Sequence, residues 1–434
     1  MYPPGIVQAS ADAAFGAFGA LTRGSSDYLT GALHRQATPF DIGLDVLTWW
    51  TTALRREPPQ WASPHGVVRE WPIARLRDFS TGSTVEQVPT LLLPPQAGHD
   101  SCIVDYAPGQ SQIMTARTAG LTRVYSMDWI GATPETKDAS IEDYIAVLDE
   151  ALDHLGGRAN LVGDCQGGWL AVIYAALRPE RVHTLTIAGA PVDFHAGEPL
   201  IHDWMRVLSP GRDLAFYRGV VRANGGVLPG SFLLGGFMNL QPHNELDRQL
   251  QLLAHIHDED HVARYRSFET WFQHTQPIPG AFYLWIVEHL FMNNELVAGT
   301  LLVGDELVDL GRINSPIYVL AGETDHITPP LQVYALADYA GTDPSDVRRE
   351  LSPGGHLGLF MSHEALRSHW LPLFADIAER SAPAKAPAAS TGPAASTDPA
   401  PAKAPAPTKA RAATKRPADS TGPAPTTGSA LTDG

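Results

Sequence analysis

Cysteine and long apolar runs are both scarce in this sequence, and each scarcity excludes a class of protein. The 434 residues contain 2 cysteines, Cys102 and Cys165. Two cysteines cannot build a disulfide framework, so we expect a protein of the reducing cytoplasm. No run of about 18 apolar residues occurs, so no transmembrane helix is expected. The N-terminal residues lack the early positive charge of a secretion signal, and none is predicted.

Positive charge is also in short supply. Lysine and arginine number 31 against 47 aspartates and glutamates, which gives a net charge of −16. Phosphate binding requires a basic face, so we expect no nucleic acid partner for the body of the protein. The segment 381–434 differs, because six basic and three acidic residues are spread among Ala, Pro, Ser, Thr and Gly. With almost no aliphatic or aromatic residues it cannot offset chain entropy, and we predict a disordered basic tail.

The rest of the chain has what a large core needs, since 44% of the residues are hydrophobic. Strand-like apolar runs alternate with helical patterns over much of its length. These runs begin at Val88, Leu121, Asn160, His183, Ser315 and Val347. Strands that alternate with helices predict a mostly parallel sheet covered by helices on both faces.

These patterns divide the chain into five segments. We expect an N-terminal helical extension over 1–80 and an α/β core in two parts, 81–194 and 311–380. A mostly helical cap over 195–310 is inserted between the two parts, and the tail follows. An insertion at this point is expected to lie over the ends of the strands, where it can help to form a binding site.

Residues 40–56, FDIGLDVLTWWTTALRR, predict an amphipathic helix within the N-terminal extension. Its apolar residues recur at roughly helical spacing, at Ile42, Leu44, Leu47, Trp50 and Leu54. We expect this apolar face to pack on the body of the protein, as such faces usually do. Docking on a lipid or polymer surface is the alternative.

The strongest chemical signal is Gly163-Asp164-Cys165-Gln166-Gly167, a nucleophile-elbow pattern in which cysteine replaces serine. A predicted strand precedes it and a predicted helix follows. We therefore predict Cys165 as the nucleophile, with an oxyanion hole at Gln166 and Ala97. A buried structural cysteine in a glycine turn is the alternative. Asp164 is expected to oppose thiolate formation through its negative charge.

Two further residues complete the predicted catalytic set. Asp325 follows the apolar run IYVLAGET, and His356 lies in the glycine loop SPGGHLGLF. Cys165, Asp325 and His356 occur in the order nucleophile, acid, histidine that this elbow requires. An Asx turn at Asp325 and a capping role for His356 are the alternatives. His326 is a weaker candidate for the base, because it lacks the glycine loop.

A histidine-rich stretch, His255-Ile256-His257-Asp258-Glu259-Asp260-His261, resembles a metal-binding motif but has one residue too many before its final pair. We expect a solvated helix end here, and we predict neither a metal nor a cofactor.

Cys102 is expected to be a small buried residue near the active-site loop.

These motifs resemble the polyhydroxyalkanoate synthase family, and in particular the short catalytic subunit of its two-subunit class. GDCQGG with the following WLAVIYAALRPERVHTLTIAGAPVDF is similar to the lipase-like box and next helix of that family. VPTLLLPPQAGHDSCIVDYAPGQSQI, AGETDHITPP and SPGGHLGLF resemble its early strand, acid and histidine motifs. A synthase-related branch with a similar CQ-G-W box matches equally well. The resemblance covers about 87–195 and 314–379, and Trp169 is bulkier than expected after the glycine pair.

The resemblance implies an α/β-hydrolase fold in which Cys165 carries the acyl group, His356 is the base and Asp325 supports the incoming hydroxyl. The implied activity is polymerisation of 3-hydroxyacyl-CoA into polyhydroxyalkanoate through a cysteine thioester. A thiolate suits this chemistry, because thioester exchange changes the free energy little and keeps the acyl group activated.

Two alternatives remain. The first is a polyester depolymerase or acyl-thioester hydrolase with the same residues, and the second is a non-catalytic granule-associated binding protein. A polymer granule surface, a partner subunit and a homo-oligomer are the candidate partners besides the 3-hydroxyacyl-CoA or polyester substrate.

Overall fold

The structure is a computed structural model that describes residues 4–55, 57–82, 86–197, 199–211 and 213–383. The predicted basic tail lies outside these residues from position 384 onward. None of the helices in the described ranges is both long and apolar enough to cross a membrane.

An eight-stranded sheet forms the centre of the protein, with the strand order β1-β2-β6-β3-β7-β8-β13-β14. β1 and β2 pair in antiparallel fashion, as do β2 and β6, and the pairs from β6 to β14 are parallel. The strands are β1 (Gly66–Glu70), β2 (Ala74–Asp78), β3 (Thr90–Leu93), β6 (Val124–Trp129), β7 (Ala159–Asp164), β8 (Val182–Ala188), β13 (Ile317–Gly322) and β14 (Val347–Ser352). This order, with strand crossovers through helices, is the α/β-hydrolase fold.

The inner strands read as unbroken apolar runs because helices cover both faces of the sheet. Every residue of β3, β7 and β13 is buried. These strands and the other parallel ones lie where the apolar runs predict them. β1 and β2 were not predicted, since β1 is exposed throughout and carries no apolar alternation. The expected helical extension over 1–80 therefore also contains two strands of the main sheet.

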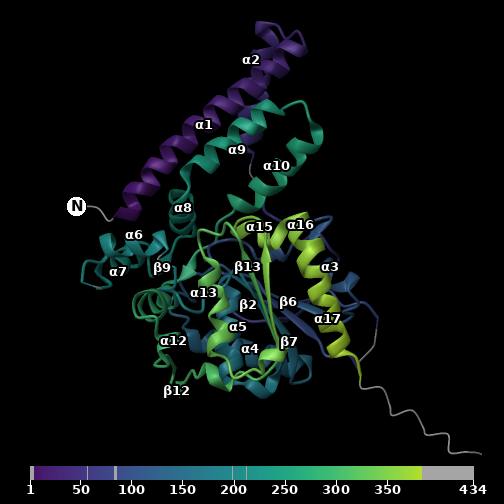
Figure 1. Cartoon of the computed structure of the whole chain (residues 1–434), viewed down its shortest axis with the longest axis vertical. Helices are drawn as coiled ribbons and strands as arrows, with labels where there is room; N and C mark the ends of the chain where they lie inside the picture. The colour runs from purple at the N-terminus through teal and green to yellow at the C-terminus, as the bar shows by residue number, and fades with distance from the viewer. Residues whose placement is uncertain (1–3, 56, 83–85, 198, 212, 384–434) are drawn as a thin grey trace, which may run out of the picture. The chain divides into compact units, whose positions relative to one another are not determined.

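Two buried clusters occupy the two faces of the sheet. One contains the inner faces of α4 (Ile141–Leu155), α5 (Gln166–Leu177) and α13 (Pro330–Tyr334), and the other those of α3 (Gln112–Thr118) and α17 (Leu371–Ser381). Figure 1 shows α17 and α3 on one side of the strands and α5 and α13 on the other. The remaining short elements of the core are β4 (Asp105–Ala107), β5 (Gln110–Ser111), α14 (Leu336–Tyr339), α15 (His356–Met361) and α16 (His363–Ala365).

The segment between β8 and β13 is mostly helical, as expected for the cap. Besides its helices it contains two small two-stranded antiparallel sheets, one of which is a hairpin. Its elements are α6 (Leu200–Leu208), α7 (Ala215–Ala223), β9 (Val227–Leu228), α8 (Gly230–Leu240), α9 (Pro242–Ala254), α10 (Glu259–Phe272), β10 (Ile278–Pro279), α11 (Gly280–Trp285), α12 (Glu295–Ala298), β11 (Leu302–Val303) and β12 (Glu306–Leu307).

Two N-terminal helices, α1 (Pro4–His34) and α2 (Pro39–Leu54), pack against this insertion. α1 runs beside α9, as Figure 1 shows. Glycines allow the close approach: a Cβ on Gly16 would lie 2.6 Å from the His243 ring, and one on Gly24 would lie 2.5 Å from Leu250. α9 thus has α1 along one face.

The expectation that the apolar face of 40–56 packs on the body is wrong. The helix is present as α2, begun by a capping box at Thr38 and Asp41. However, Leu44, Leu47, Trp50 and Leu54 are 46% to 57% exposed. The fully buried residues of α2 are the polar Asp45 and Thr52, and beside them Trp49 and Ala53 pack on a small apolar cluster of the insertion. The Asp45 carboxylate accepts hydrogen bonds from Tyr28, Arg35 and His257 at 2.7 to 3.0 Å.

The end of α17 also differs from the expected domain boundary. Ser381, assigned to the tail from the sequence, is buried. The Asn160 amide donates to its hydroxyl oxygen at 2.8 Å, and its carbonyl accepts from the Val88 N–H at 3.2 Å. The ordered core therefore extends through Ser381.

Candidate active site

The turn from β7 into α5 holds Cys165 in a strained backbone conformation. Its φ of 48° and ψ of −115° fall where non-glycine residues rarely lie. The turn fits only because the flanking residues are glycines. A Cβ on Gly167 would lie 1.9 Å from the Leu93 carbonyl oxygen, and one on Gly163 would lie 2.5 Å from the Gly167 carbonyl oxygen. The glycines of the motif are therefore required by close backbone contact.

The predicted oxyanion residues lie on both sides of this turn. Gln166 is the first residue of α5, so its N–H belongs to the group of helix N-terminal donors that bind anions. Ala97 lies in the loop that follows β3. The insertion holds this loop: the Gly98 carbonyl accepts from the Gln276 N–H at 2.8 Å, and the His99 ring stacks on Trp271 with centroids 4.7 Å apart.

Asp325 and His356 form a buried pair. His356 Nδ1 lies 2.7 Å from Asp325 Oδ2. The other carboxylate oxygen, Oδ1, accepts the N–H groups of Ile327 and Thr328, each at 2.9 Å. Asp325 is thus fixed by its own loop and orients the imidazole ring. The adjacent His326 does not take this place, and burial lowers its pKa.

Thr328 is a member of this network that the sequence reading missed. Its Oγ1 lies 2.8 Å from Asp325 Oδ2, 2.9 Å from the Gly189 carbonyl oxygen and 3.2 Å from His356 Nδ1. The signal was its position three residues after an acid at a strand end, which is typical of a threonine that hydrogen-bonds in a turn.

The histidine and the cysteine also interact. Burial by itself would lower the pKa of His356, but the charges of Asp325 and Cys165 and hydrogen bonds to both side chains raise it well above its ordinary value. Burial would likewise raise the pKa of Asp325, but His356 and the Thr328 hydrogen bonds lower it. The site therefore favours an imidazolium between a carboxylate and the cysteine, which is the arrangement that activates a thiol.

The second cysteine is inert in comparison. Cys102 is buried, and its N–H donates to the Asp100 side chain at 2.9 Å. Burial and the charge of Asp100 raise the pKa of its thiol. The structure confirms the prediction of a small buried residue.

A cavity of about 520 Å³ opens beside His356. Core loops form one wall with Thr324, His326 and Gly355, and α8, α9 and α10 form the other. The wall includes Gln241, which caps the start of α9, and Asn244, Glu245 and Arg248, whose spacing places them on one face of α9. The insertion thus covers the candidate site, and α9 lies between the cavity and α1.

Arg248 is the central charge of the cavity wall, and it is fully paired. Its guanidinium forms ion pairs with Glu245 and, at 2.6 Å, with Glu269. It also lies 4.8 Å and 4.7 Å from the ring centroids of Phe268 and Phe272. An arginine with these contacts holds α9 and α10 together, because Glu245 lies on α9 while Glu269, Phe268 and Phe272 lie on α10.

Comparison with known sequences places this site in a family. Residues 73–377 match the family described as "Protein of unknown function (DUF3141)". The chain belongs to this family.

Curated relatives of this DUF3141 protein have a named activity. It is 29% identical over 282 residues to "Poly(3-hydroxyalkanoate) polymerase subunit PhaC" of Synechocystis sp., covering 62% of this chain and 74% of that protein. It is 28% identical over 288 residues to the protein of the same name from Haloferax mediterranei, covering 64% of this chain and 56% of that protein. The DUF3141 chain is therefore a distant homologue of these subunits, and it spans little more than half of the Haloferax protein.

Solved structures resemble the DUF3141 chain in fold. A thermophilic esterase from Thermogutta terrifontis has a TM-score of 0.41 and 19% identity, covering 70% of this chain and 94% of that one. A carboxylesterase from Nitrososphaera gargenis has a TM-score of 0.45 and 15% identity, covering 73% and 99%. Similarity at this level concerns the fold alone.

The predicted charge of Asp164 is wrong. Asp164 was expected to place a negative charge beside Cys165. Its carboxyl group is buried, and burial raises its pKa well above the ordinary value, although the Gln112 side chain and the charge of His356 act to lower it. The neutral acid is thus favoured, so Asp164 does not oppose the thiolate.

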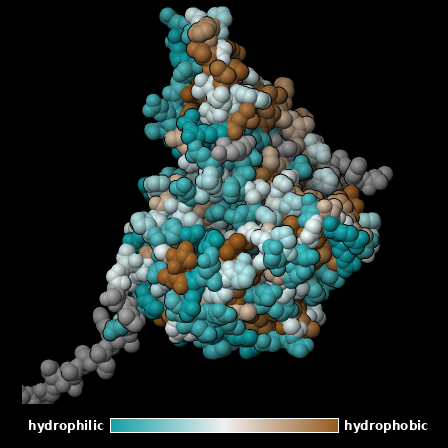
Figure 2. All heavy atoms as spheres, turned by 180° about the vertical axis from the view of Figure 1, so that it is seen from behind, coloured by the Kyte–Doolittle hydropathy of each residue, from teal (hydrophilic) through white to brown (hydrophobic). Residues whose placement is uncertain are grey.

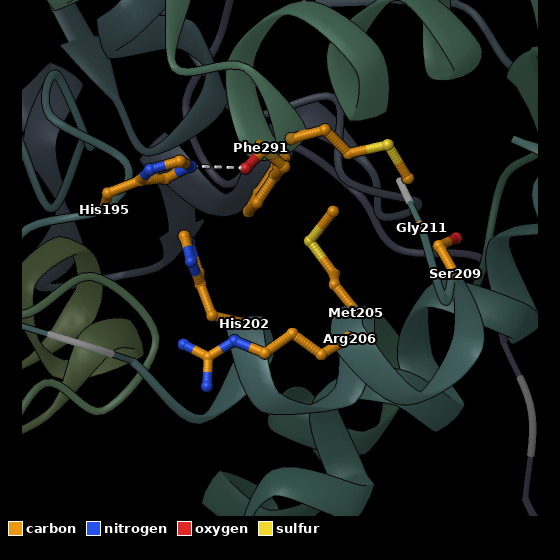
Figure 3. Close-up of a pocket in the computed structure, with 8 residues that line it drawn as sticks. His195, His202, Met205, Arg206, Ser209, Gly211 and Phe291 are labelled. Carbon is orange, nitrogen blue, oxygen red and sulfur yellow. Dashed lines mark hydrogen bonds between the residues drawn. The ribbon is translucent and has the colours of Figure 1, made fainter. Parts of the chain in front are cut away.

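A second cavity, of about 360 Å³, lies apart from these residues. Figure 3 shows His195 and His202 pointing into it opposite Met205, with Phe291 above. Burial lowers the pKa of His202 to about 4, and Arg206 pairs with Asp203 at 2.8 Å. The histidine is therefore neutral at pH 7 and the arginine is compensated, so this cavity has little attraction for an anion.

The histidine-rich stretch also has a structural explanation. His257 Nε2 lies 2.7 Å from Asp45 of α2. The rings of His255 and His261 stack with centroids 4.6 Å apart. Among the described residues, no group of three or more histidine, cysteine or acidic side chains is placed to hold a metal ion.

Proposed function

We propose that this protein is an acyltransferase that polymerises 3-hydroxyacyl-CoA through a thioester on Cys165. The observation that carries the proposal is a cysteine at a nucleophile elbow whose neighbour, His356, has its pKa raised by Cys165 and Asp325 together. A cysteine beside a protonated histidine is the usual arrangement of a reactive cysteine nucleophile.

The proposed reaction has two halves. In the first, the Cys165 thiolate attacks the substrate carbonyl carbon, and the N–H groups of Gln166 and Ala97 stabilise the oxyanion. The C–S bond to coenzyme A then breaks, and His356 gives its proton to the departing thiolate. In the second, His356 takes the proton of an incoming hydroxyl group, whose oxygen attacks the enzyme thioester and releases the Cys165 thiolate. Each bond formed is matched by one broken, and no redox partner is required.

The cavity beside His356 supports an acyl substrate. Phe237, Met238, Phe268 and Phe272 give its insertion side an apolar lining, while Gln241 and Asn244 add amide groups. An acyl chain that carries a hydroxyl group needs both kinds of contact. The printed name of the distant relatives, poly(3-hydroxyalkanoate) polymerase subunit, supports the same substrate class.

Incubation with 3-hydroxybutyryl-CoA tests the proposal. We expect release of free coenzyme A thiol and an acyl product that elongates into polyester. Thiol release with only free 3-hydroxybutyrate as product would instead favour the hydrolase. No thiol release from the wild-type protein, with Cys165 inert to alkylation, would favour the non-catalytic granule-associated protein.

The two halves of the reaction can be separated at Asp325. Asp325→Asn keeps the size of the side chain and one hydrogen bond to the ring. We expect Cys165 still to be acylated but the second transfer to slow, so that an acyl adduct accumulates. Intact-protein mass spectrometry after mixing with 3-hydroxybutyryl-CoA detects the adduct, and Asp325→Asn combined with Cys165→Ala is the control that should carry none.

The proposal also covers the location of the enzyme and the role of the inserted segment. We propose that the enzyme works in the cytoplasm at the surface of polyhydroxyalkanoate granules, with residues 195–310 as the cap over the site. No metal or cofactor takes part in the proposed steps.

A further inference from the structure

Exposed apolar side chains are concentrated on α1 and α2 within the part of the chain that the structure describes. In the described part of the chain, 21 large apolar side chains are exposed, and 11 of them fall between Phe15 and Leu54. Phe15, Phe18, Leu33 and Phe40 are each more than 70% exposed. Figure 2 shows apolar residues gathered on this part of the surface. Patches of this size on a protein surface mark contact sites.

The protein's own insertion does not cover this surface. The side of α1 that meets α9 is marked by its buried residues Ala20, Gly24, Tyr28 and Ala32, which recur every four positions. At 100° per residue, Phe15, Phe18, Leu29 and Leu33 lie on the opposite side of the helix. The stripe of these four residues therefore points away from α9.

The charges nearby argue against an anionic membrane as the occupant. Residues 4–55 contain three arginines, no lysine and four aspartates. Arg35 is already paired with Asp45 at 2.8 Å. Helices that bind anionic lipid surround their apolar face with many basic residues, and these helices do not.

The exposed area matches what a protein partner covers. The 11 side chains together expose on the order of 1,000 Å², since a large aromatic or aliphatic side chain contributes roughly 100 to 200 Å². A stable protein interface buries about 800 Å² per partner. The apolar surface of α1 and α2 is therefore large enough to hold a dimer together.

The pattern along α1 is self-complementary. Phe15 and Phe18 lie near one end and Leu29 and Leu33 near the other, while the centre has small exposed residues at Thr22, Ser25 and Ser26. If two α1 helices pair in antiparallel fashion about residue 24, Phe15 of one copy lies opposite Leu33 of the other, and Phe18 lies within one residue of the position opposite Leu29. A two-fold interface requires this kind of match, and small central residues let the helices approach closely.

From this geometry we infer that α1 and α2 form the interface of a homodimer in which two α1 helices pair in antiparallel fashion. The inference does not rest on the proposed acyltransferase activity. It assigns the occupant of the apolar surface as a second copy of this chain, and it assigns α9 a bridging position between that interface and the cavity beside His356.

Molar mass in solution tests the inference. The full chain should elute with twice the 46.8 kDa of one copy when light scattering is measured during size exclusion. Phe15→Glu combined with Leu33→Glu should give the mass of one copy, with an unchanged far-ultraviolet circular dichroism spectrum. Leu302→Glu combined with Leu307→Glu, which alters two half-exposed leucines of the β11–β12 hairpin, is the matched control and should remain dimeric.

Two results would overturn the inference. The first is that the wild-type chain stays monomeric at tens of micromolar. The second is that the Phe15→Glu, Leu33→Glu variant remains a dimer. If that variant lost helicity, Phe18→Ser with Leu29→Ser replaces it under the same criteria. A monomer that sediments with polyhydroxybutyrate granules or floats with phosphatidylcholine vesicles through Phe15 and Leu33 would show that a surface, and not a second copy, covers the stripe.

Cross-linking tests the antiparallel arrangement. In a Cys165→Ala background, Ser25→Cys should form an intermolecular disulfide on oxidation, because residue 25 lies beside the two-fold axis. Gln8→Cys should not, since the two copies of residue 8 would lie about 48 Å apart along the helices. Cross-linking at Gln8→Cys, or failure at Ser25→Cys in a chain that is dimeric by mass, would exclude this pairing.

Discussion

The two helices α5 and α2 read alike in the sequence as apolar helical segments, but their surroundings are opposite. All 12 residues of α5 are buried. In α2, of 16 residues, the two that are buried are Asp45 and Thr52, while the leucines and the tryptophan at position 50 are exposed. Hydrophobic spacing thus predicted a helix in both places, and in α2 it did not predict which face the protein would bury.

The two helices differ in how they are attached to the rest of the fold. α5 follows a strand of the main sheet without a loop, so it must lie on that sheet, and its small residues let it do so closely. α2 is attached on one side, where Asp45 accepts hydrogen bonds from α1 and from the α9–α10 connection and Trp49 packs on the apolar cluster there. This attachment leaves the stripe of Leu44, Leu47 and Leu54 free for another partner.

The largest difference between the two regions is expected in the rate of coenzyme A release. Cys165→Ala should abolish release of coenzyme A from 3-hydroxybutyryl-CoA, because the elbow then carries no nucleophile. Cys165→Ser should retain only a small fraction of the rate, since an alcohol is harder to ionise than a thiol. Thr48→Ala on the exposed side of α2 should leave the rate unchanged. Thiol release followed with a chromogenic disulfide measures all three, and an active Cys165→Ala enzyme would contradict the assignment.

Two glycine substitutions, one at the elbow before α5 and one in α2, should change the free energy of unfolding in opposite directions. Gly167→Ala should cost more than about 3 kcal/mol or prevent folding, because its Cβ would lie 1.9 Å from the Leu93 carbonyl oxygen. Gly43→Ala in α2 meets no atom within 4 Å and should raise the free energy of unfolding by about 0.5 to 1 kcal/mol. Urea denaturation measures both. Equal effects would mean that the elbow is not closely packed.

A pair of substitutions within α2 tests its attachment. Asp45→Ala should lower the free energy of unfolding by about 1 to 3 kcal/mol, since it leaves the buried Tyr28 hydroxyl unpaired and removes the hydrogen bonds of Arg35 and His257. Trp50→Ala should change it by no more than about 0.5 kcal/mol in the monomer, because Trp50 is 54% exposed. Thermal or urea unfolding of the two variants checks the ranking, and a larger loss for Trp50→Ala would reverse our account of α2.

The smallest expected effect is on the pH dependence of stability. Because the folded-state pKa of His356 is raised, its contribution to stability is complete below the unfolded pKa near 6.5 and is lost as the pH rises through the folded value. The free energy of unfolding of the wild type should therefore fall toward alkaline pH more than that of His356→Gln. The same variant should alkylate with iodoacetamide at Cys165 about 10-fold more slowly at pH 7. Superimposable pH profiles would contradict the charged pair.

Much of the sheet could be read from the sequence because parallel inner strands are apolar on both faces. β3, β7 and β13 were predicted from such runs. β1 was not, since an exposed edge strand of polar and β-branched residues has no distinct pattern. Cys165, Asp325 and His356 followed from their order along the chain, whereas Thr328 did not, because its role depends on contacts with Gly189 and His356 that are remote in sequence.

By itself, the sequence determined the elbow, since a cysteine between glycines after a buried strand leaves the backbone one workable turn. It also determined the helical character of 40–56. Only the tertiary structure decided that Asp164 is buried and so favours its neutral form, and that the fully buried residues of α2 are Asp45 and Thr52. The physical reason is the same in both cases: spacing along the chain sets local conformation, but burial and charge depend on neighbours that folding brings from elsewhere.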